Sequence, residues 1–186
     1  LLNFCTVDLS AFYFDIRKDA LYCDSKDSDR RSSSIIVLNI ILESLIKWFA
    51  PILSFTTEEI YRLIDKDKKS IHLENFMEFP KMFKNINLNK KWLELKKIRD
   101  ICNVSIEAKR TAKEIGSSLE SNLIISLNKD LYEISNQVDF AELCITSSAT
   151  VTRSTSEGVM VETKKATGNK CPVCWKITQD KCARHS

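Results

Sequence analysis

The sequence is poor in glycine and proline, with three of each among its 186 residues. Both residues interrupt helices, because glycine costs backbone entropy and proline lacks a donor N–H. Their scarcity therefore favours a mainly helical chain. The sequence also lacks a glycine-rich phosphate loop, a Ser/His/Asp arrangement and paired carboxylates in a predicted cleft. No residue pattern in these 186 residues predicts catalysis.

Long apolar runs are absent as well. No stretch of about 18 apolar residues occurs, which predicts that nothing in this sequence spans a membrane. The first residue is Leu1, and no signal-peptide pattern follows it. We interpret the chain as a fragment whose missing part lies upstream.

A disulfide framework is also missing, although the sequence has seven cysteines. Four of them stand singly in apolar stretches, without regular spacing: Cys5, Cys23, Cys102 and Cys144. Their arrangement and the odd total predict a reducing compartment rather than a secreted, cross-linked protein. A composition of 44% hydrophobic and 28% charged residues is that of an ordinary soluble chain with a core to bury.

The other three cysteines gather near the end of the chain, where they form the pattern Cys-x2-Cys-x7-Cys-x2-His. The predicted ligands are Cys171, Cys174, Cys182 and His185. Three sulfurs and one nitrogen form a closed tetrahedral set, which suits one structural zinc ion and leaves no open position for chemistry. The competing interpretation is chance spacing in a disordered end. The joint occurrence of the two ligand pairs favours zinc.

Apolar periodicity predicts helices over much of the first 116 residues. Residues 9–23 carry an apolar stripe through Phe12, Ile16 and Ala20, typical of an amphipathic helix. The segment 56–59 has the Thr-x-x-Glu spacing of a capping box and predicts the start of a later helix.

Between these segments, residues 34–51 are apolar on nearly all sides. The polar interruptions Asn39, Glu43 and Lys47 fall four residues apart and form one narrow stripe. This pattern predicts a helix that is buried on most of its surface, in the middle of a bundle.

A basic helix is predicted from Lys90 to Glu114, which contains eight Lys or Arg and four Asp or Glu, with Gly116 as its stop. It is amphipathic, with an apolar stripe through Trp92, Leu95, Ile98 and Cys102 and much of the charge on the other side. A charge run alone is usually a solvated surface. A metal knuckle and an aromatic ring nearby favour a nucleic-acid contact instead, because basic groups bind phosphates and exposed rings stack on unpaired bases. The predicted contact residues are Lys96, Lys97, Arg99, Lys109, Arg110, Lys113, Trp175 and Lys176. Trp175 is equally compatible with a place in the core of the knuckle.

After Gly116 the pattern changes to short runs rich in branched apolar residues, around a polar helical stretch at about 129–137. The segment 158–166 alternates and predicts a strand. We therefore expect a mainly α fold in three parts. They are a helical bundle over residues 1–116, a small α/β unit over 117–168 and a zinc knuckle over 169–186.

Several blocks of the sequence resemble one family. LSAFYFDIRKDALYCD, residues 9–24, resembles the signature that starts the anticodon-binding helical domain of isoleucyl-tRNA synthetases. The chain also resembles later blocks of that family, in the same order, at residues 48–61, 70–76 and 99–121. The ending KCPVCWK…CARH resembles the zinc tail of bacterial members, which usually have a fourth cysteine where this chain has His185.

The resemblance implies an anticodon-binding fold and a role in protein synthesis. The whole enzyme would be a ligase that uses ATP to activate isoleucine and joins it to tRNA(Ile). Its ATP-binding and editing domains would lie upstream, so no residue of this chain is assigned catalysis. The implied partners are tRNA(Ile) and the upstream catalytic domain, in a monomeric, cytoplasmic protein.

Two other classes stay open. A stand-alone zinc-finger nucleic-acid-binding module, such as the C-terminal part of a DNA glycosylase, accounts for the tail and the basic helix but not for residues 9–24 or 48–61. A helical interaction domain with a purely structural metal is the third interpretation.

Overall fold

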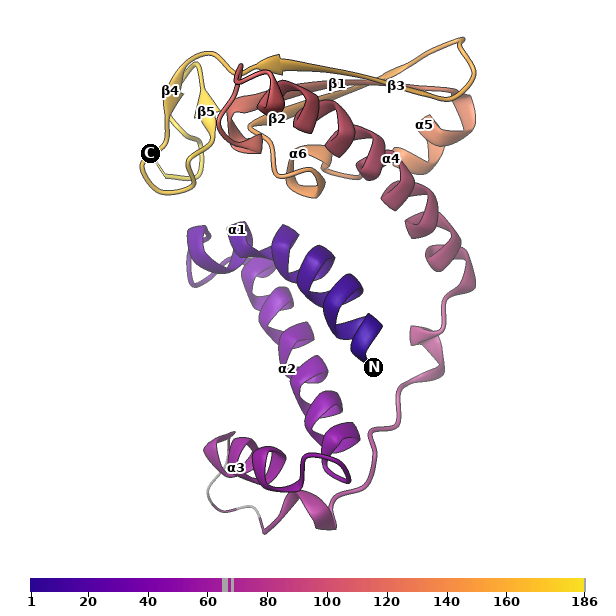
Figure 1. The fold of residues 1–186 in the computed structure, drawn as a ribbon, viewed down its shortest axis with the longest axis vertical. Helices are drawn as coiled ribbons and strands as arrows, with labels where there is room; N and C mark the ends of the chain where they lie inside the picture. The colour runs from indigo at the N-terminus through magenta and orange to yellow at the C-terminus, as the bar shows by residue number, and fades with distance from the viewer. Residues whose placement is uncertain (65–66, 68, 186) are drawn as a thin grey trace. The chain divides into compact units, whose positions relative to one another are not determined.

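The computed structural model describes residues 1–64, 67 and 69–185 (Figure 1). It separates into two compact units, one made of Leu1–Cys23 with Asn85–Ser186 and the other of Asp24–Lys84. The chain thus leaves the first unit after its N-terminal helix and later returns to it. The predicted parts 1–116 and 169–186 include positions 65, 66, 68 and 186, which lie outside the described residues. The domain boundaries at 116 and 168 stay predictions.

The first unit opens with a continuous helical segment. Its first part, η1 (Phe4–Phe14), has wide π-type turns, and its second part is α1 (Asp15–Cys23). The predicted stripe faces the core, since Ile16 and Ala20 are buried and Phe12 packs against the same cluster. The helix predicted over residues 9–23 is confirmed.

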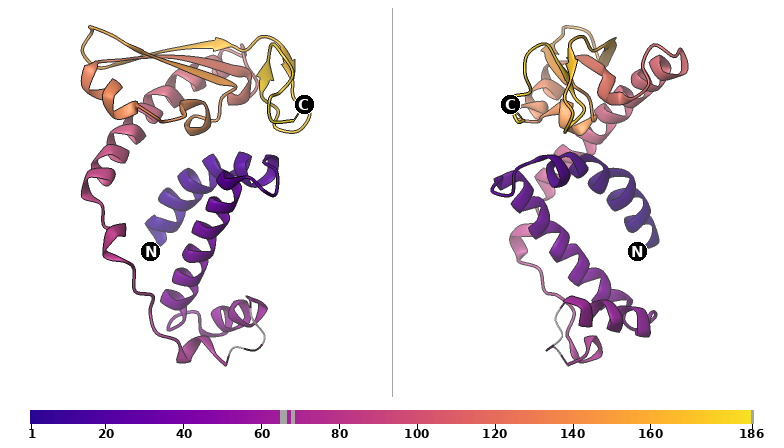
Figure 2. Two further views of the ribbon diagram at one scale, coloured as in Figure 1. Left: turned by 180° about the vertical axis from the view of Figure 1, so that it is seen from behind. Right: turned by 90° about the vertical axis from the view of Figure 1, so that its left-hand side faces the viewer.

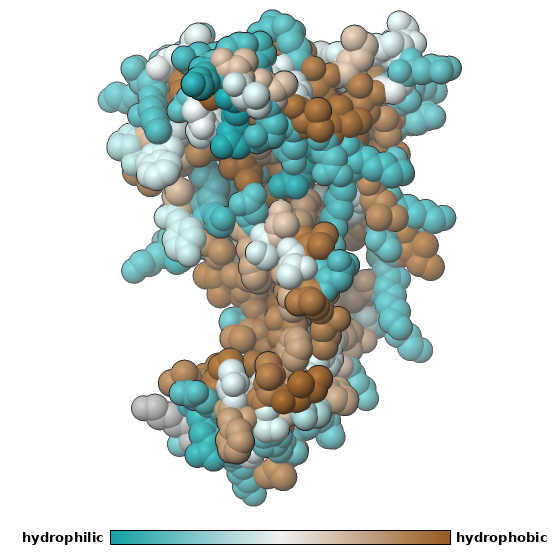
Figure 3. Space-filling model, in the orientation of Figure 1, coloured by the Kyte–Doolittle hydropathy of each residue, from teal (hydrophilic) through white to brown (hydrophobic). Residues whose placement is uncertain are grey.

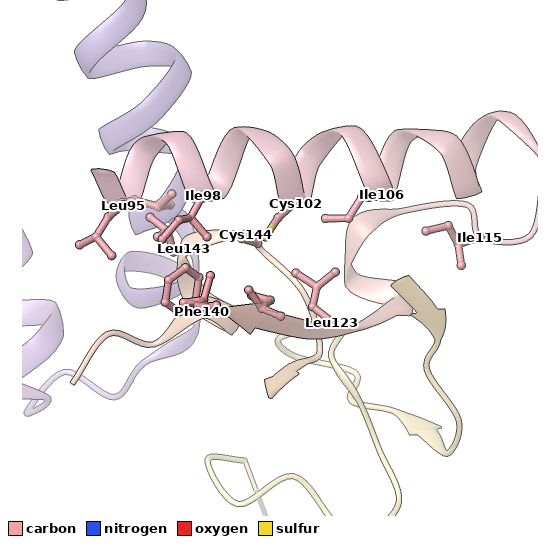
Figure 4. Packing of buried hydrophobic residues seen from close by; sticks show 12 residues of the cluster. Leu95, Ile98, Cys102, Ile106, Ile115, Leu123, Phe140, Leu143 and Cys144 are labelled. Atoms are coloured by element: carbon pink, nitrogen blue, oxygen red, sulfur yellow. The ribbon is translucent and has the colours of Figure 1, made fainter. Parts of the chain in front are cut away.

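The core of this unit lies between α4 (Ile86–Thr111) and the sheet that follows it. Figure 4 shows Leu95, Ile98, Cys102 and Ile106 pointing from one side of α4 towards Leu123 on β1. The period of these four positions is that of one helix face, so the predicted amphipathic helix is confirmed.

The end of α4 differs from the prediction. The helix stops at Thr111, and Lys113 takes the left-handed conformation with φ 58°. The amides of Lys113 and Glu114 donate to the carbonyls of Arg110 and Lys109. This is the Schellman arrangement, in which Lys113 occupies the position that glycine usually takes. Gly116 lies beyond the end of the helix, so the prediction that the helix stops at Gly116 was wrong.

The predicted α/β character of the next segment is present. Strands β1 (Ser121–Leu127), β2 (Ser148–Arg153) and β3 (Val159–Lys165) form one sheet in the order β2-β1-β3. β1 runs parallel to β2 and antiparallel to β3. The parallel pair needs a crossover, which is supplied by α5 (Lys129–Ser135) and α6 (Phe140–Leu143). Together with the helices, this small sheet makes the fold mainly helical with a small α/β part.

The second unit is built on α2 (Asp29–Phe49) and α3 (Ser54–Ile64), with short turns at η2 (Ile71–Leu73) and η3 (Lys81–Phe83). A small cluster of Ile46, Ala50, Tyr61 and Ile71 forms its core. The predicted capping box was wrong, because α3 begins at Ser54 and residues 56–59 lie inside the helix.

The prediction that α2 is buried on most of its surface was also wrong for the part of the chain described. Its buried residues are Ser34, Ser44 and Ile46, whereas Ile36 is 60% exposed. Figure 3 shows the apolar surface that α2 presents. By length and composition alone, α2 is apolar enough to cross a membrane, a test that the core helix of a soluble protein also meets.

Candidate metal centre

The four predicted metal ligands come together at a short hairpin, with Cys171 and Cys174 inside it and Cys182 and His185 in the segment that follows. Strand β4 (Asn169–Lys170) pairs antiparallel with β5 (Ile177–Thr178), at one end of the three-stranded sheet in Figure 2. Between the two strands, the Trp175 amide donates to the Cys171 carbonyl at 3.0 Å. The Cys171 amide donates to the Lys176 carbonyl at 2.9 Å. These bonds close a tight turn that turns Cys171 and Cys174 to the same side.

Gly168 permits the close approach of the hairpin strands. Its φ is 128°, and a Cβ at this position would overlap the main-chain carbonyl of Thr178. Both facts restrict the position to glycine, because L side chains rarely adopt this conformation and the backbone has no room to move aside. The hairpin that carries the ligands therefore depends on this residue.

The ligand atoms have the spacing of a metal site. The Sγ atoms of Cys171, Cys174 and Cys182 and a ring nitrogen of His185 all lie within 4.8 Å of one another. Cys174 Sγ and Cys182 Sγ are 3.8 Å apart, and His185 Nδ1 is 3.4 Å from both Cys171 Sγ and Cys182 Sγ. A tetrahedral ion with metal–sulfur bonds of about 2.3 Å places two sulfurs about 3.8 Å apart and a sulfur and a nitrogen about 3.6 Å apart. The residues therefore fit a tetrahedral metal ion.

The thiols differ in their tendency to ionise. Main-chain N–H groups of Cys174 and Val173 lower the pKa of Cys171 to about 6, which favours its thiolate near neutral pH. Burial raises the pKa of Cys174 to about 11. A bound cation removes the proton from such a thiol, so metal binding and thiol ionisation are coupled.

Two residues of the predicted basic helix face the N-terminal helix. Arg99 donates from Nε to the Leu143 carbonyl at 2.9 Å and lies 3.7 Å from Asp15, and its side chain is only 13% exposed. Lys96 donates to Asp8 at 2.9 Å. Both side chains therefore brace the fold where α4, α6 and the N-terminal helix meet.

The other predicted basic residues are more open. Each of Lys97, Lys109 and Arg110 pairs with a nearby carboxylate at the surface, Glu94, Glu114 and Glu107 respectively. Exposed pairs of this kind contribute little stability, so these cations can exchange their partners for phosphate at small cost. Lys113 is exposed at the C-terminal end of α4, in the same region as Lys109 and Arg110.

Trp175 lies outside the core of the knuckle. Its side chain is 58% exposed, and the Lys170 ammonium lies 5.3 Å from the centre of its ring. Trp175 and Lys176 line an apolar cavity of about 370 Å³ that also contacts Ile16 and Tyr22 of α1. The knuckle and the N-terminal helix thus share one apolar recess with an exposed ring at its edge.

Comparison with known proteins assigns the chain to a family. Residues 1–126 match the protein-family model described as "Anticodon-binding domain of tRNA ligase". The chain belongs to this family. It is 73% identical, over its whole length, to an isoleucine–tRNA ligase of Pelagibacter ubique. It is 42% identical over 97% of its length to the isoleucine–tRNA ligase of Agrobacterium fabrum, and 41% identical over 97% to that of Bartonella henselae.

The resemblance to isoleucyl-tRNA synthetases is therefore confirmed. The chain spans about a fifth of the length of the relatives it matches. Sequence reasoning found the ligands of its candidate metal centre but missed Tyr22 and the contacts of the knuckle with α1. The spacing of residues along the chain does not predict these contacts, because the knuckle and α1 come from opposite ends of the sequence.

Proposed function

We propose that this chain is the C-terminal, tRNA-binding part of an isoleucine–tRNA ligase. The observation that supports this most strongly is the 73% identity with such a ligase over the whole chain. The full-length enzyme would be a monomeric, cytoplasmic protein that activates isoleucine with ATP and joins it to tRNA(Ile). ATP would bind in its catalytic domain, outside this chain, and the present residues would position the tRNA.

Zinc is the metal that we propose for the knuckle. Cys171, Cys174, Cys182 and His185 would hold one ion in a closed set, and the ion would supply structural cross-links and no reaction chemistry. Since a unit this small has little core, most of its folding free energy would come from metal binding.

The tRNA backbone is proposed to contact the open cations of α4. Lys109, Arg110 and Lys113 lie together at its C-terminal end, while Lys97 lies further towards its start. Phosphate contacts position the nucleic acid without reading its sequence. Lys96 and Arg99 were predicted for the same role, but the Arg99 side chain is largely buried and Lys96 is held by Asp8 and the Phe12 ring, so their contribution would be indirect.

Unpaired anticodon bases are proposed to meet the protein at the recess beside the knuckle. Trp175 offers an exposed ring for stacking, and Lys176 offers a donor at the same edge. Recognition of single-stranded RNA commonly combines an aromatic platform with such a donor.

A titration of the chain with two RNAs tests the proposal. One is tRNA(Ile), and the other is the same tRNA with a swapped anticodon, each measured with zinc and after chelation. We expect tighter binding to the isoleucine anticodon, and this preference should disappear on chelation. Replacement of Lys109 and Arg110 by glutamate should weaken both complexes equally and reduce the salt dependence of binding. Preference for duplex DNA over both tRNAs would instead favour the stand-alone zinc-finger module.

A further inference from the structure

Polar contacts attach the predicted metal knuckle to the last turns of α1. His185 Nε2 lies 2.7 Å from the main-chain carbonyl oxygen of Cys23. Arg184 forms an ion pair with Asp19 at 2.7 Å, and the Cys23 thiol lies 3.7 Å from the Val173 carbonyl. These contacts join two ends of the sequence, so none of them follows from local folding.

The Cys23 carbonyl is a favourable acceptor because of its place in the helix. Cys23 is the last residue of α1, and the last carbonyls of a helix have no intrahelical donor. They also lie at the negative end of the helix dipole, which favours a polarised N–H donor. A donor from the knuckle at 2.7 Å therefore meets a carbonyl at the negative end of the helix.

His185 supplies that donor whenever its Nε2 carries a proton, in the imidazolium or in one of the two neutral tautomers. Nδ1 faces the ligand set, 3.4 Å from the sulfurs of Cys171 and Cys182. A metal ion bound at Nδ1 requires the neutral ring to carry its proton on Nε2, the atom that faces Cys23. The ion thus fixes both the tautomer and the direction of the N–H group. A cysteine ligand has no second donor and could not do this.

We propose that His185 is a positioning residue that couples metal occupancy to the docking of the knuckle on α1. The ion would fix the imidazole, the imidazole N–H would hold the end of α1, and the shared apolar recess beside Tyr22 and Trp175 would keep its shape. Hydrogen bonds of this kind to the free nitrogen of a ligating histidine typically change metal affinity by about 10- to 100-fold. The inference rests on the proposed metal centre but not on tRNA binding.

The substitution His185→Cys separates the coupling from metal binding, because it keeps four donors and removes the N–H group. Two quantities are measured on the chain with Co²⁺ in place of zinc. The visible absorption of the ion reports tetrahedral coordination, and amide hydrogen exchange of residues 20–24 reports the docking of α1. For the unsubstituted chain, we expect tetrahedral absorption and exchange about tenfold slower with the metal than after chelation.

For His185→Cys we expect tetrahedral absorption to persist while the exchange of residues 20–24 rises to the level of the chelated chain. The matched control is Lys181→Ala, which changes an exposed residue of the knuckle outside the ligand set and outside the contacts with α1, and it should leave exchange unchanged. Full protection in His185→Cys would overturn the coupling, and so would unchanged exchange of the original chain on chelation. The comparison of the original chain with and without metal uses no variant, so it does not depend on whether a variant folds. Absence of tetrahedral absorption in the original chain would refute the metal centre itself.

Discussion

The guanidinium of Arg99 on α4 donates to the main-chain carbonyl of Leu143, at the end of α6, at 2.9 Å. The same group lies 5.4 Å from the centre of the Phe12 ring in the N-terminal helix. One side chain therefore connects three segments that are distant in the sequence. Arg99, a residue of the predicted basic helix, therefore also braces the fold.

Replacement of Arg99 should accordingly reduce stability. We expect Arg99→Ala to lower the free energy of unfolding by about 2 kcal/mol, because a hydrogen bond to a charged donor is lost and the Leu143 carbonyl loses its partner. Urea denaturation measures this change. The matched control is Lys97→Ala, which removes an exposed charge and should change the free energy by less than about 0.5 kcal/mol. Equal effects of the two substitutions would contradict the bracing role.

The end of α4 offers a stabilising change. Lys113 has a φ of 58°, which strains a side chain but not glycine. We expect Lys113→Gly to raise the free energy of unfolding by about 1 kcal/mol and the melting temperature by about 2–4 °C. Lys109→Gly, inside the same helix, should lower stability by about 1 kcal/mol instead. A thermal melt in which both variants move in the same direction would refute this account of the helix end.

Glu58 is predicted to make the second unit sensitive to acid. Its carboxylate accepts hydrogen bonds from Arg62, Ser70 and the Ile71 amide, which lower its pKa from 4.5 to about 2. A carboxyl group with a lowered folded-state pKa stabilises the fold above its unfolded pKa, and this contribution is lost as the pH falls from about 4.5 towards 2. We expect Glu58→Gln to be less stable than the original chain at pH 7.

The stability difference between Glu58→Gln and the original chain should shrink between pH 5 and pH 3, measured by urea denaturation at each pH. Glu59→Gln is the matched control, because Glu59 is an exposed neighbour on the same helix. A constant difference across this pH range would show that the hydrogen bonds of Glu58 do not depend on its charge.

Gly168 provides a test of the hairpin that carries the metal ligands. Gly168→Ala should weaken metal binding, because a Cβ at this position overlaps the Thr178 carbonyl and moves β4 away from β5. Competition with a chromophoric chelator measures the affinity, and we expect a loss of at least about tenfold. Gly158→Ala is a suitable control, since Gly158 also has a positive φ but a Cβ there meets no other atom. Equal affinity in both variants would mean that the close approach is not needed.

Local patterns in the sequence predicted those features that local physics determines. The helix over residues 9–23 and the apolar face of α4 follow from periodicity, and the ligand set follows from spacing in the knuckle. The burial of α2 could not be predicted, because an apolar helix does not specify which neighbours cover it. The role of Arg99 was hidden for a similar reason, since its partner Leu143 is far away in the sequence.

The return of the chain to its first unit has a consequence for the order of folding. Residues 24–84 form their unit from nearby contacts, whereas the contacts of Asp19 and Cys23 must wait for Arg184 and His185. Closing so long a loop is slow, and on the ribosome the last turns of the first helix cannot be secured until synthesis has reached the tail. The contacts of Asp19 and Cys23 with the tail are thus among the last to form.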